Sequence, residues 1–292
     1  MLPEANKIKE LLYVSDGYTN EVYVYDFTTN LLVGRLGGFK YPYGQCVDAK
    51  GDVWITQFSS AEVIEYAHGG DSPIKTLNTA ALNYSFGCSI DPKTGNLAVA
   101  NDGSSNPGQI FVFKGASGTP KAYSSKNCPV LGSPGYDLKG NLYVESGQEK
   151  TYAICELARG AKSLKAMEMN QIIYSAGSVM WDGQYIAVTD EAYQGNQTTA
   201  IYQMVESSSG NLVIAGTTVL ADDCGSAEYI SQPFIVGTVN TPRNRTQGTV
   251  VIGGNEGCHG RFDSWSYPAG GTPAPLFMAP KEPVGQSVSI AQ

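Results

Sequence analysis

The sequence predicts an all-β chain that folds as one six-bladed β-propeller, and three observations support this fold. Short runs rich in β-branched and aromatic residues alternate with turns rich in Asp and Gly, and the 292 residues include 34 glycines. These runs recur with a fixed period and with several strands in each repeat, which is typical of a propeller or a solenoid. The last run of the chain supplies the strand that the first repeat lacks, so the ring can close without exposed edges.

The repeat is clearest over residues 42–66. A first strand over residues 44–48 leads through a turn into a second strand at 52–56, and a third strand follows at 62–66. A weaker apolar run at 74–77 predicts a fourth strand, because an outer edge strand tolerates irregular sequence. The same pattern predicts the later repeats, whose second strands we expect at 97–100, 142–144, 185–188 and 249–252.

The two ends of the chain predict how the propeller closes. The N-terminal repeat begins with its second strand at residues 11–16, and no first strand precedes it. Residues 284–290 resemble residues 43–48 and can serve as that missing strand. Five complete repeats and one shared repeat make six blades, so we expect a single domain over residues 1–292.

Composition excludes several classes of protein. The net charge is −8 with no cluster of Lys or Arg, so we expect no nucleic-acid partner. No apolar run reaches the roughly 20 residues of a membrane-spanning helix. We expect a monomer that binds a small molecule. The first residues lack the layout of a signal peptide, but the cysteines favour a periplasmic or extracellular protein whose signal peptide is not present in this sequence.

Six cysteines occur without the C-x-x-C spacing or the paired histidines of a zinc site. Their positions suggest three bridges, Cys128–Cys155, Cys224–Cys258 and Cys46–Cys88. Buried free thiols are the alternative, because a chain of this length does not need disulfides.

Acids and amides follow the predicted second strands. They are Asp16, Gln57, Asn101, Asp102, Glu145, Asp190, Glu191, Asn255 and Glu256. Such hard oxygen ligands are what Ca²⁺ requires. The alternative is that each side chain accepts hydrogen bonds from the backbone of a neighbouring loop. The doubled positions favour a metal, because only one member of each pair can bind the loop.

Aromatic residues lie near the expected starts of the first strands, chiefly Tyr43, Phe86, Tyr136, Tyr229 and Phe234. Apolar walls with a few polar groups are typical of a small-molecule pocket, although such rings can also simply pack between blades. His259 lies near Glu256 in a glycine-rich segment, and we predict that this pair acts as a catalytic base. An exposed loop histidine is the alternative.

Residues 12–22, LYVSDGYTNEV, and residues 137–144, DLKGNLYV, are similar to the core of an NHL repeat. That repeat is shared by NHL propellers and by the six-bladed superfamily of gluconolactonases, paraoxonases, diisopropyl-fluorophosphatases and strictosidine synthase. The resemblance implies a calcium held by Glu, Asn and Asp residues just before the glycine of each first strand. The matching positions here are Tyr43, Phe86, Ala176 and Val284, which cannot bind a metal, although Glu282 lies close enough to substitute.

These observations predict a hydrolase of small esters, lactones or phosphotriesters, assisted by a divalent cation at the mouth of the central channel. The expected metal ligands are Asp102, Glu145, Asp190, Glu191, Asn255, Glu256 and Glu282. The alternative is a non-catalytic propeller that binds a sugar, a peptide or a protein partner.

Overall fold

Nearly all the regular structure of the chain is β-strand. The computed structural model describes residues 1–80, 82–102, 107–148, 151–196, 198–221, 230–239, 248–255, 261–278 and 281–292. Three short 3₁₀ turns interrupt the strands within these ranges, at Ala5–Lys7, Lys114–Ala116 and Tyr193–Gly195. No helix in this part of the chain has the length and apolar character needed to cross a membrane.

Three sheets have four antiparallel strands each. The first has the order β24 (Pro283–Ile290), β1 (Glu10–Asp16), β2 (Glu21–Asp26) and β3 (Leu32–Leu36). The second contains β4 (Pro42–Val47), β5 (Val53–Gln57), β6 (Glu62–Tyr66) and β7 (Pro73–Asn78). The third contains β8 (Ser85–Ile90), β9 (Leu97–Asn101), β10 (Gln109–Phe113) and β11 (Lys121–Tyr123).

The remaining twelve strands form one sheet that divides into three antiparallel groups of four. Among the described residues, these groups are joined by single parallel pairs between strands, Ser133 with Ser178 and Leu220 with Gly271, and by an isolated parallel bridge between Met169 and Leu212. The first group is β12 (Val130–Tyr136), β13 (Leu142–Gln148), β14 (Thr151–Leu157) and β15 (Lys165–Met167). The second is β16 (Ala176–Trp181), β17 (Ile186–Asp190), β18 (Thr199–Glu206) and β19 (Leu212–Leu220). The third is β20 (Ile230–Val239), β21 (Gly248–Asn255), β22 (Arg261–Ser266) and β23 (Gly270–Met278).

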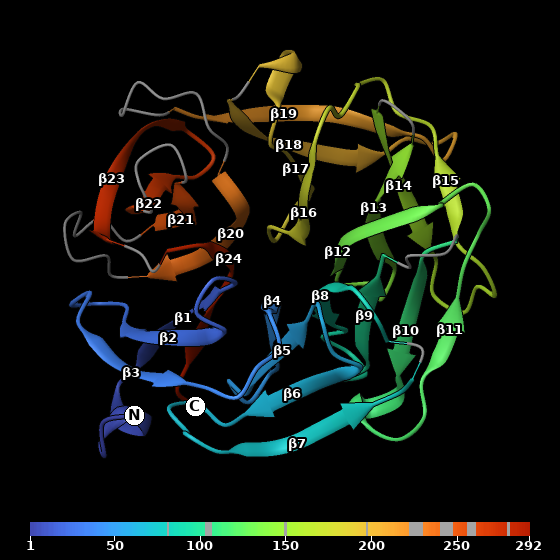
Figure 1. The fold of residues 1–292 in the computed structure, drawn as a ribbon. Coiled ribbons are helices and arrows are strands. Elements are labelled where there is room, and N and C mark those ends of the chain that lie inside the picture. The colour runs from blue at the N-terminus through green and yellow to red at the C-terminus, as the bar shows by residue number, and fades with distance from the viewer. Residues whose placement is uncertain are drawn as a thin grey trace.

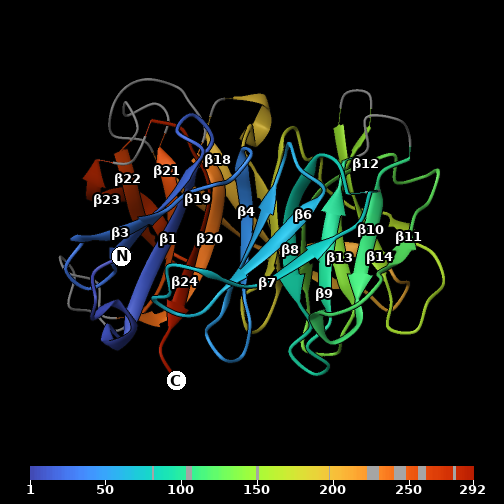
Figure 2. The same ribbon diagram turned by 60° about the horizontal axis from the view of Figure 1, so that its bottom comes forward.

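The four-strand groups are arranged radially around a central axis, and Figure 2 shows the same groups from the side. In Figure 1 the first strands β4, β8, β12, β16 and β20 lie nearest the centre, and β3, β7, β11, β15, β19 and β23 lie at the periphery. We call β24, β4, β8, β12, β16 and β20 the inner strands. Consecutive inner strands contact one another, and β20 also contacts β24.

Glycines let the inner strands approach one another at backbone distance. A Cβ atom on Gly44 would lie 2.6 Å from the Cα of Gly87, and one on Gly285 would lie 3.1 Å from the Cα of Gly44. A Cβ on Gly135 would likewise lie 3.0 Å from the Cα of Met180. Only glycine fits at such close approaches, which explains why it recurs in the sequence at this point of the repeat.

Buried apolar clusters lie between neighbouring groups of strands. Trp54 of β5, for example, packs with Val99 of β9 and Phe113 of β10. Another cluster joins Ile252 of β21 and Phe262 of β22 to Leu12 of β1. The core therefore consists of apolar layers between neighbouring sheets, because strands that are apolar on both faces must be covered on both sides.

The last strand of the chain pairs with the first. β24 lies antiparallel to β1, with Leu11 opposite Ser289 and Val14 opposite Gln286. This pairing of C-terminal and N-terminal strands agrees with the prediction from the sequence.

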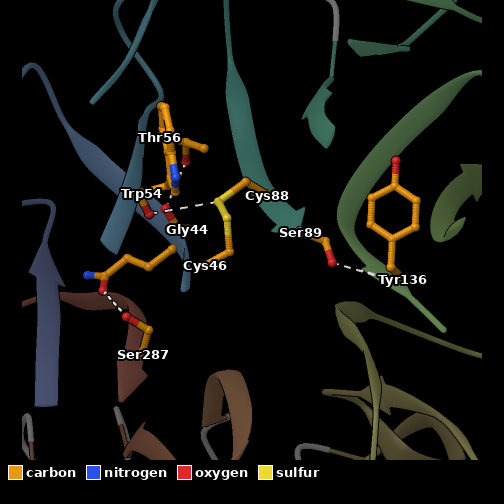
Figure 3. Close-up of a disulfide and its surroundings, with 9 residues drawn as sticks. Gly44, Cys46, Trp54, Thr56, Cys88, Ser89, Tyr136 and Ser287 are labelled. Atoms are coloured by element: carbon orange, nitrogen blue, oxygen red, sulfur yellow. Dashed lines mark hydrogen bonds between the residues drawn. A yellow bond between two sulfur atoms is a disulfide. The ribbon is translucent and has the colours of Figure 1, made fainter. Parts of the chain in front are cut away.

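Two of the three suggested disulfides are confirmed. Cys46 of β4 is bonded to Cys88 of β8, so this bridge joins two adjacent inner strands (Figure 3). Cys128 is bonded to Cys155 of β14, which ties the segment before β12 to its own sheet. Cys224 and Cys258 lie outside the described residues.

Candidate functional site

Four buried side chains at the ends of second strands form hydrogen bonds with the loops that lead into the inner strands. Asp16, Gln57, Asn101 and Asp190 end their second strands and pair with the first residue of the inner strand beside them. Each accepts a hydrogen bond from a backbone N–H of the loop that precedes that inner strand. The donors are Glu282 to Asp16 (3.1 Å), Lys40 to Gln57 (2.6 Å), Asn83 to Asn101 (2.8 Å), and Tyr174 and Ser175 to Asp190 (3.1 and 3.0 Å).

We call Asp16, Gln57, Asn101 and Asp190 the latch residues. The sequence left open whether acids and amides here would bind a metal or a loop, and at these four positions they bind loops. Asp190 was among the expected metal ligands, but its Oδ1 already accepts three backbone N–H groups, from Tyr174, Ser175 and Ala192. A carboxylate so fully bonded stabilises the loop and has little capacity left for a cation.

Glu145 does not occupy the latch position of its sheet. Leu131, near the start of β12, pairs with Ser146, so Ser146 is the residue equivalent to the latches. Glu145 stands one residue earlier and therefore projects from the other face of the strand. The equivalent residues in the other sheets are small, for example Ser15, Thr56 and Thr189.

The Glu145 carboxyl group is fully buried, and neither of its oxygens makes a hydrogen bond of normal geometry, although the backbone N–H of Gly177 lies near enough to lower its pKa slightly. Burial raises the pKa of Glu145 well above its usual value, and the nearby charges of Glu191 and Asp190 raise it further. The amide of Gly177 opposes this effect only weakly. An unpaired carboxyl group in such surroundings stays protonated unless a cation neutralises it.

Two glycines at a repeated β-bulge lie beside the carboxyl groups of Glu145 and Glu191. The inner strand β20 shifts register between Ser231 and Phe234. The other five inner strands contain one extra residue next to the latch, at Tyr43, Phe86, Gly132, Gly177 and Val284. We call these the bulge residues, and we call the end of the channel where they lie the mouth. A Cβ atom on Gly132 would lie 3.5 Å from Oε2 of Glu145, and one on Gly177 would lie 2.9 Å from Oε1 of Glu191. Bulges often re-aim side chains beside functional sites.

Asp102 and Glu191 directly follow latch residues, and both reach the same region. The charges of Glu145, Glu191 and Asp102 all raise the pKa of Tyr152, after the larger effect of burial, so Tyr152 lies within electrostatic range of all three acids. Burial also raises the pKa of Asp102. We call Asp102, Glu145, Tyr152 and Glu191 the acidic sector. No pattern in the sequence pointed to Tyr152, which lies near the start of a third strand.

Aromatic rings adjoin the acidic sector at the mouth, because the backbone N–H of Asp102 donates to the carbonyl of Tyr84 at 3.0 Å. Tyr43 contacts Phe86 with ring centroids 5.1 Å apart, and Phe58 contacts both rings. Tyr41 and Tyr84 extend this group, and both adopt positive φ angles of 58° and 63°. A positive φ angle raises the conformational energy of a bulky residue, and residues in this conformation tend to occur at functional sites. We call these five residues the aromatic sector.

Glu282 lies beside the aromatic sector, where its Oε1 accepts a hydrogen bond from the Tyr41 hydroxyl at 2.8 Å. The structure therefore gives this expected metal ligand a different partner.

Two aromatic residues lie away from the mouth. Tyr136 is the last residue of β12, at the opposite end of the inner strand, so its expected position at a strand entrance was wrong. The error arose because β12 begins at Val130, within a segment whose Gly and Pro residues hide the strand. Phe234 lies within β20 and lines the channel cavity described below.

Several predicted site residues lie outside the described residues. These are Tyr229, Glu256 and His259, together with the side chain of Asn255. Their roles stay predictions.

One further acidic group escaped the sequence reasoning. Ligand atoms of Asp48, Asp52 and Glu65 lie within 4.8 Å of one another, the one such group of three in the described part of the chain. Glu65 is paired with Lys75 at 3.4 Å, and Asp48 accepts two backbone N–H groups of its own turn. This group lies at the β4–β5 turn, away from the mouth, and its existing partners explain it as part of the turn.

No protein-family model matches the sequence, and no curated protein does either. Solved structures do resemble the chain over nearly its whole length. A chain of the nidogen–laminin complex has a TM-score of 0.71 and 11% identity, covering 97% of this chain and 99% of that chain. The fold is a β-propeller.

Two further structures agree with this propeller fold. A protein of unknown function from Bacteroides caccae has a TM-score of 0.66 and 13% identity, covering 96% of this chain and 99% of its own. A putative TolB from Agrobacterium tumefaciens has a TM-score of 0.60 and 11% identity, covering 97% and 99%. Identities this low carry the fold and no function.

Proposed function

We propose that the chain is a six-bladed propeller of the NHL-like type, closed where β24 joins β1, and that the mouth of its channel is a hydrolytic site. Three four-stranded sheets, the three groups within the large sheet, and the contact between β20 and β24 support this ring. The substrates we propose are small esters, lactones or phosphotriesters. Two disulfides suit an oxidising compartment and support an exported protein.

The single observation that carries the hydrolytic proposal is the buried carboxyl group of Glu145. It replaces a small residue of the other blades, it is fully buried, and neither of its oxygens makes a hydrogen bond of normal geometry to the described part of the chain. A buried polar group without a partner costs roughly 1–3 kcal/mol of stability. Natural proteins keep such groups mainly where a ligand or a reaction uses them.

The oxygen atoms of the acidic sector are of the kind that bind a divalent cation. Glu145 and Glu191 offer carboxylate oxygens of the kind that Ca²⁺ binds, and backbone carbonyls and water would complete the six to eight ligands that Ca²⁺ takes. A bound cation would act as a Lewis acid on a carbonyl or phosphoryl oxygen.

The protein's own residues would serve the reaction in other ways. Asp102, whose pKa burial raises, would be a better proton acceptor from water than an exposed aspartate. Tyr152, whose pKa is also raised, stays neutral and can donate a hydrogen bond. The aromatic sector would hold the apolar part of the substrate.

Hydrolysis of a panel of chromogenic esters, lactones and phosphotriesters, with EDTA and with added Ca²⁺, tests this proposal. We expect turnover that EDTA abolishes and Ca²⁺ restores, and we expect Glu145→Gln to reduce it at least about 100-fold, the scale of losing one catalytic electrostatic group. Glu206→Gln, on an exposed strand end, is the matched control and should leave turnover unchanged. Activity that survives Glu145→Gln would refute the assignment.

A non-catalytic binding propeller is the second candidate, and the aromatic sector favours it. Five partly exposed rings in contact with one another form the kind of surface that contributes most binding energy at interfaces. The panel separates the two functions, because a binding propeller would show no turnover with any substrate or metal.

A further inference from the structure

The central channel contains a second candidate site, at the end opposite the mouth. A cavity of about 290 Å³ is lined by residues from the inner strands. Val47, Ile90, Tyr136 and Trp181 line it, and these are the last residues of β4, β8, β12 and β16. The lining also includes Gly87, Ser133 and Ser178, which directly follow bulge residues, so the cavity extends along the inner strands from this end up to the mouth. No acidic-sector residue is among the described residues that line it.

The lining of this cavity is neutral. Among the described residues that line it, none is charged, and Val47, Ile90, Met180 and Phe234 supply apolar surface. The Cys46–Cys88 disulfide forms part of the wall, beside Ser89 and Tyr136 (Figure 3). Walls of this composition and a volume of this order suit a small organic ligand.

Most polar groups in the wall are already bonded. Gln45 donates to Ser15 at 2.8 Å and accepts from Ser287 at 2.8 Å. The hydroxyl of Ser89 accepts the backbone N–H of Tyr136 at 3.0 Å. In contrast, the Trp181 Nε1–H and the Ser133 hydroxyl are shielded from solvent and have no hydrogen-bond partner. The lining residues therefore retain an unused donor and an unused hydroxyl just beneath the cavity surface, which become available to one polar group of a ligand when either side chain turns.

Aspartates surround this end of the channel. Asp48, Asp91, Asp137 and Asp182 directly follow the four lining residues, and each accepts backbone N–H groups of its own turn. Lys50, Lys93 and Lys139 lie in three of the same turns, so this end of the channel carries charges of both signs and favours neither an anion nor a cation. The neutral wall offers no partner to any ion that enters, and burying an unpaired charge is costly.

We propose that this cavity binds a small, uncharged ring compound that carries one hydroxyl or carbonyl group. The ring would pack against Trp181 and the aliphatic side chains, and the polar group would bond to the Trp181 indole N–H or to Ser133. This site differs from the proposed hydrolytic site in place and in chemistry, and neither depends on the other.

Trp181 provides a direct measurement of binding. The other two tryptophans, Trp54 and Trp265, are fully buried in the core, whereas Trp181 is only partly buried and lines the cavity. Benzyl alcohol, benzoate and benzylammonium are probes of nearly equal size that differ in charge. We expect benzyl alcohol to change the tryptophan emission saturably and to bind at least about tenfold more tightly than either ion, since tenfold corresponds to about 1.4 kcal/mol. Equal binding of a charged probe, or no saturable change with benzyl alcohol, would overturn the proposal.

Variants locate the binding site. Trp181→Phe should abolish the emission change while calorimetry still detects binding of benzyl alcohol. Val47→Phe fills the cavity and should weaken binding at least about tenfold, and Ile90→Phe provides the same test if the first variant does not fold. Val130→Phe, at an exposed position outside the cavity, should bind like wild type.

Unchanged binding in both cavity-filling variants would place the ligand elsewhere and refute the site. Glu145→Gln should leave benzyl alcohol binding unchanged, which separates this test from that of the hydrolytic site.

Discussion

Replacing Glu145 by glutamine should change how the stability of the protein depends on pH. Burial, Glu191 and Asp190 raise the pKa of Glu145 in the folded state well above its usual 4.5. In the unfolded chain the carboxyl group ionises near that usual value. Its favourable contribution is therefore complete below about pH 4.5 and is lost as the pH rises toward the folded pKa. Glutamine has nearly the same shape and cannot ionise, so the variant lacks this loss.

The size of the effect follows from the linkage of one proton to folding. Between the unfolded and folded pKa values, the free energy of unfolding of the wild type should fall by up to about 1.4 kcal/mol per pH unit relative to the variant. Urea unfolding at several pH values between 4.5 and 8, in EDTA, measures this difference. Any fixed cost of the glutamine amide shifts one curve by a constant and does not change the slope.

The matched control is Glu4→Gln, which removes an exposed carboxylate that pairs only with Lys7. Its unfolding free energy should run parallel to that of the wild type. Parallel curves for Glu145→Gln as well would show that Glu145 ionises normally, and the reasoning about the acidic sector would fail. Saturating Ca²⁺ should stabilise the wild type but not the Glu145→Gln variant, because a ligand stabilises only the state that binds it.

Three further substitutions test the frame of the site. Asp190→Ala removes the acceptor of three backbone N–H groups and should lower the free energy of unfolding by at least about 3 kcal/mol, whereas Asp190→Asn keeps a carbonyl oxygen and should lose less in the same urea titration. Gly177→Ala places a Cβ 2.8 Å from Thr189 Cγ2 and 2.9 Å from Glu191 Oε1. It should lower the free energy of unfolding by about 1–3 kcal/mol and reduce turnover. Gly37→Ala is the control, because its Cβ meets no neighbouring atom and should change neither stability nor turnover. Replacing Cys46 and Cys88 by serine removes a bridge that closes a loop of 42 residues. The free energy of unfolding should fall by about 4 kcal/mol, because the unfolded chain gains conformational entropy. An unfolding midpoint equal to that of wild type would contradict this value.

The sequence contained enough information to predict the repeat, because strand periodicity and turn residues recur in every blade. The pairing of β24 with β1 was predictable for the same reason, since residues 284–290 resemble residues 43–48. Positional equivalence also identified the Cys46–Cys88 and Cys128–Cys155 bridges.

The site was less predictable because the direction of its side chains depends on the exact pairing register of the strands. A shift of one position turns a side chain to the other face of a strand. Glu145 looked like the end of its second strand, but β13 continues to Gln148, so its latch position falls on Ser146. The bulges add one residue to each inner strand, and their positions were not visible in the amino-acid pattern.

The partnership of β1 and β24 also governs when the molecule can finish folding. Leu11 pairs with Ser289, and β24 follows every other strand in the chain. Until residues 283–290 are synthesised, the edge of β1 that pairs with β24 has no partner strand. Because such distant pairing must overcome a large loop-closure entropy, the final step should be slow. A nascent chain would then expose an unpaired strand for some time, which makes it a natural client for chaperones that protect such edges.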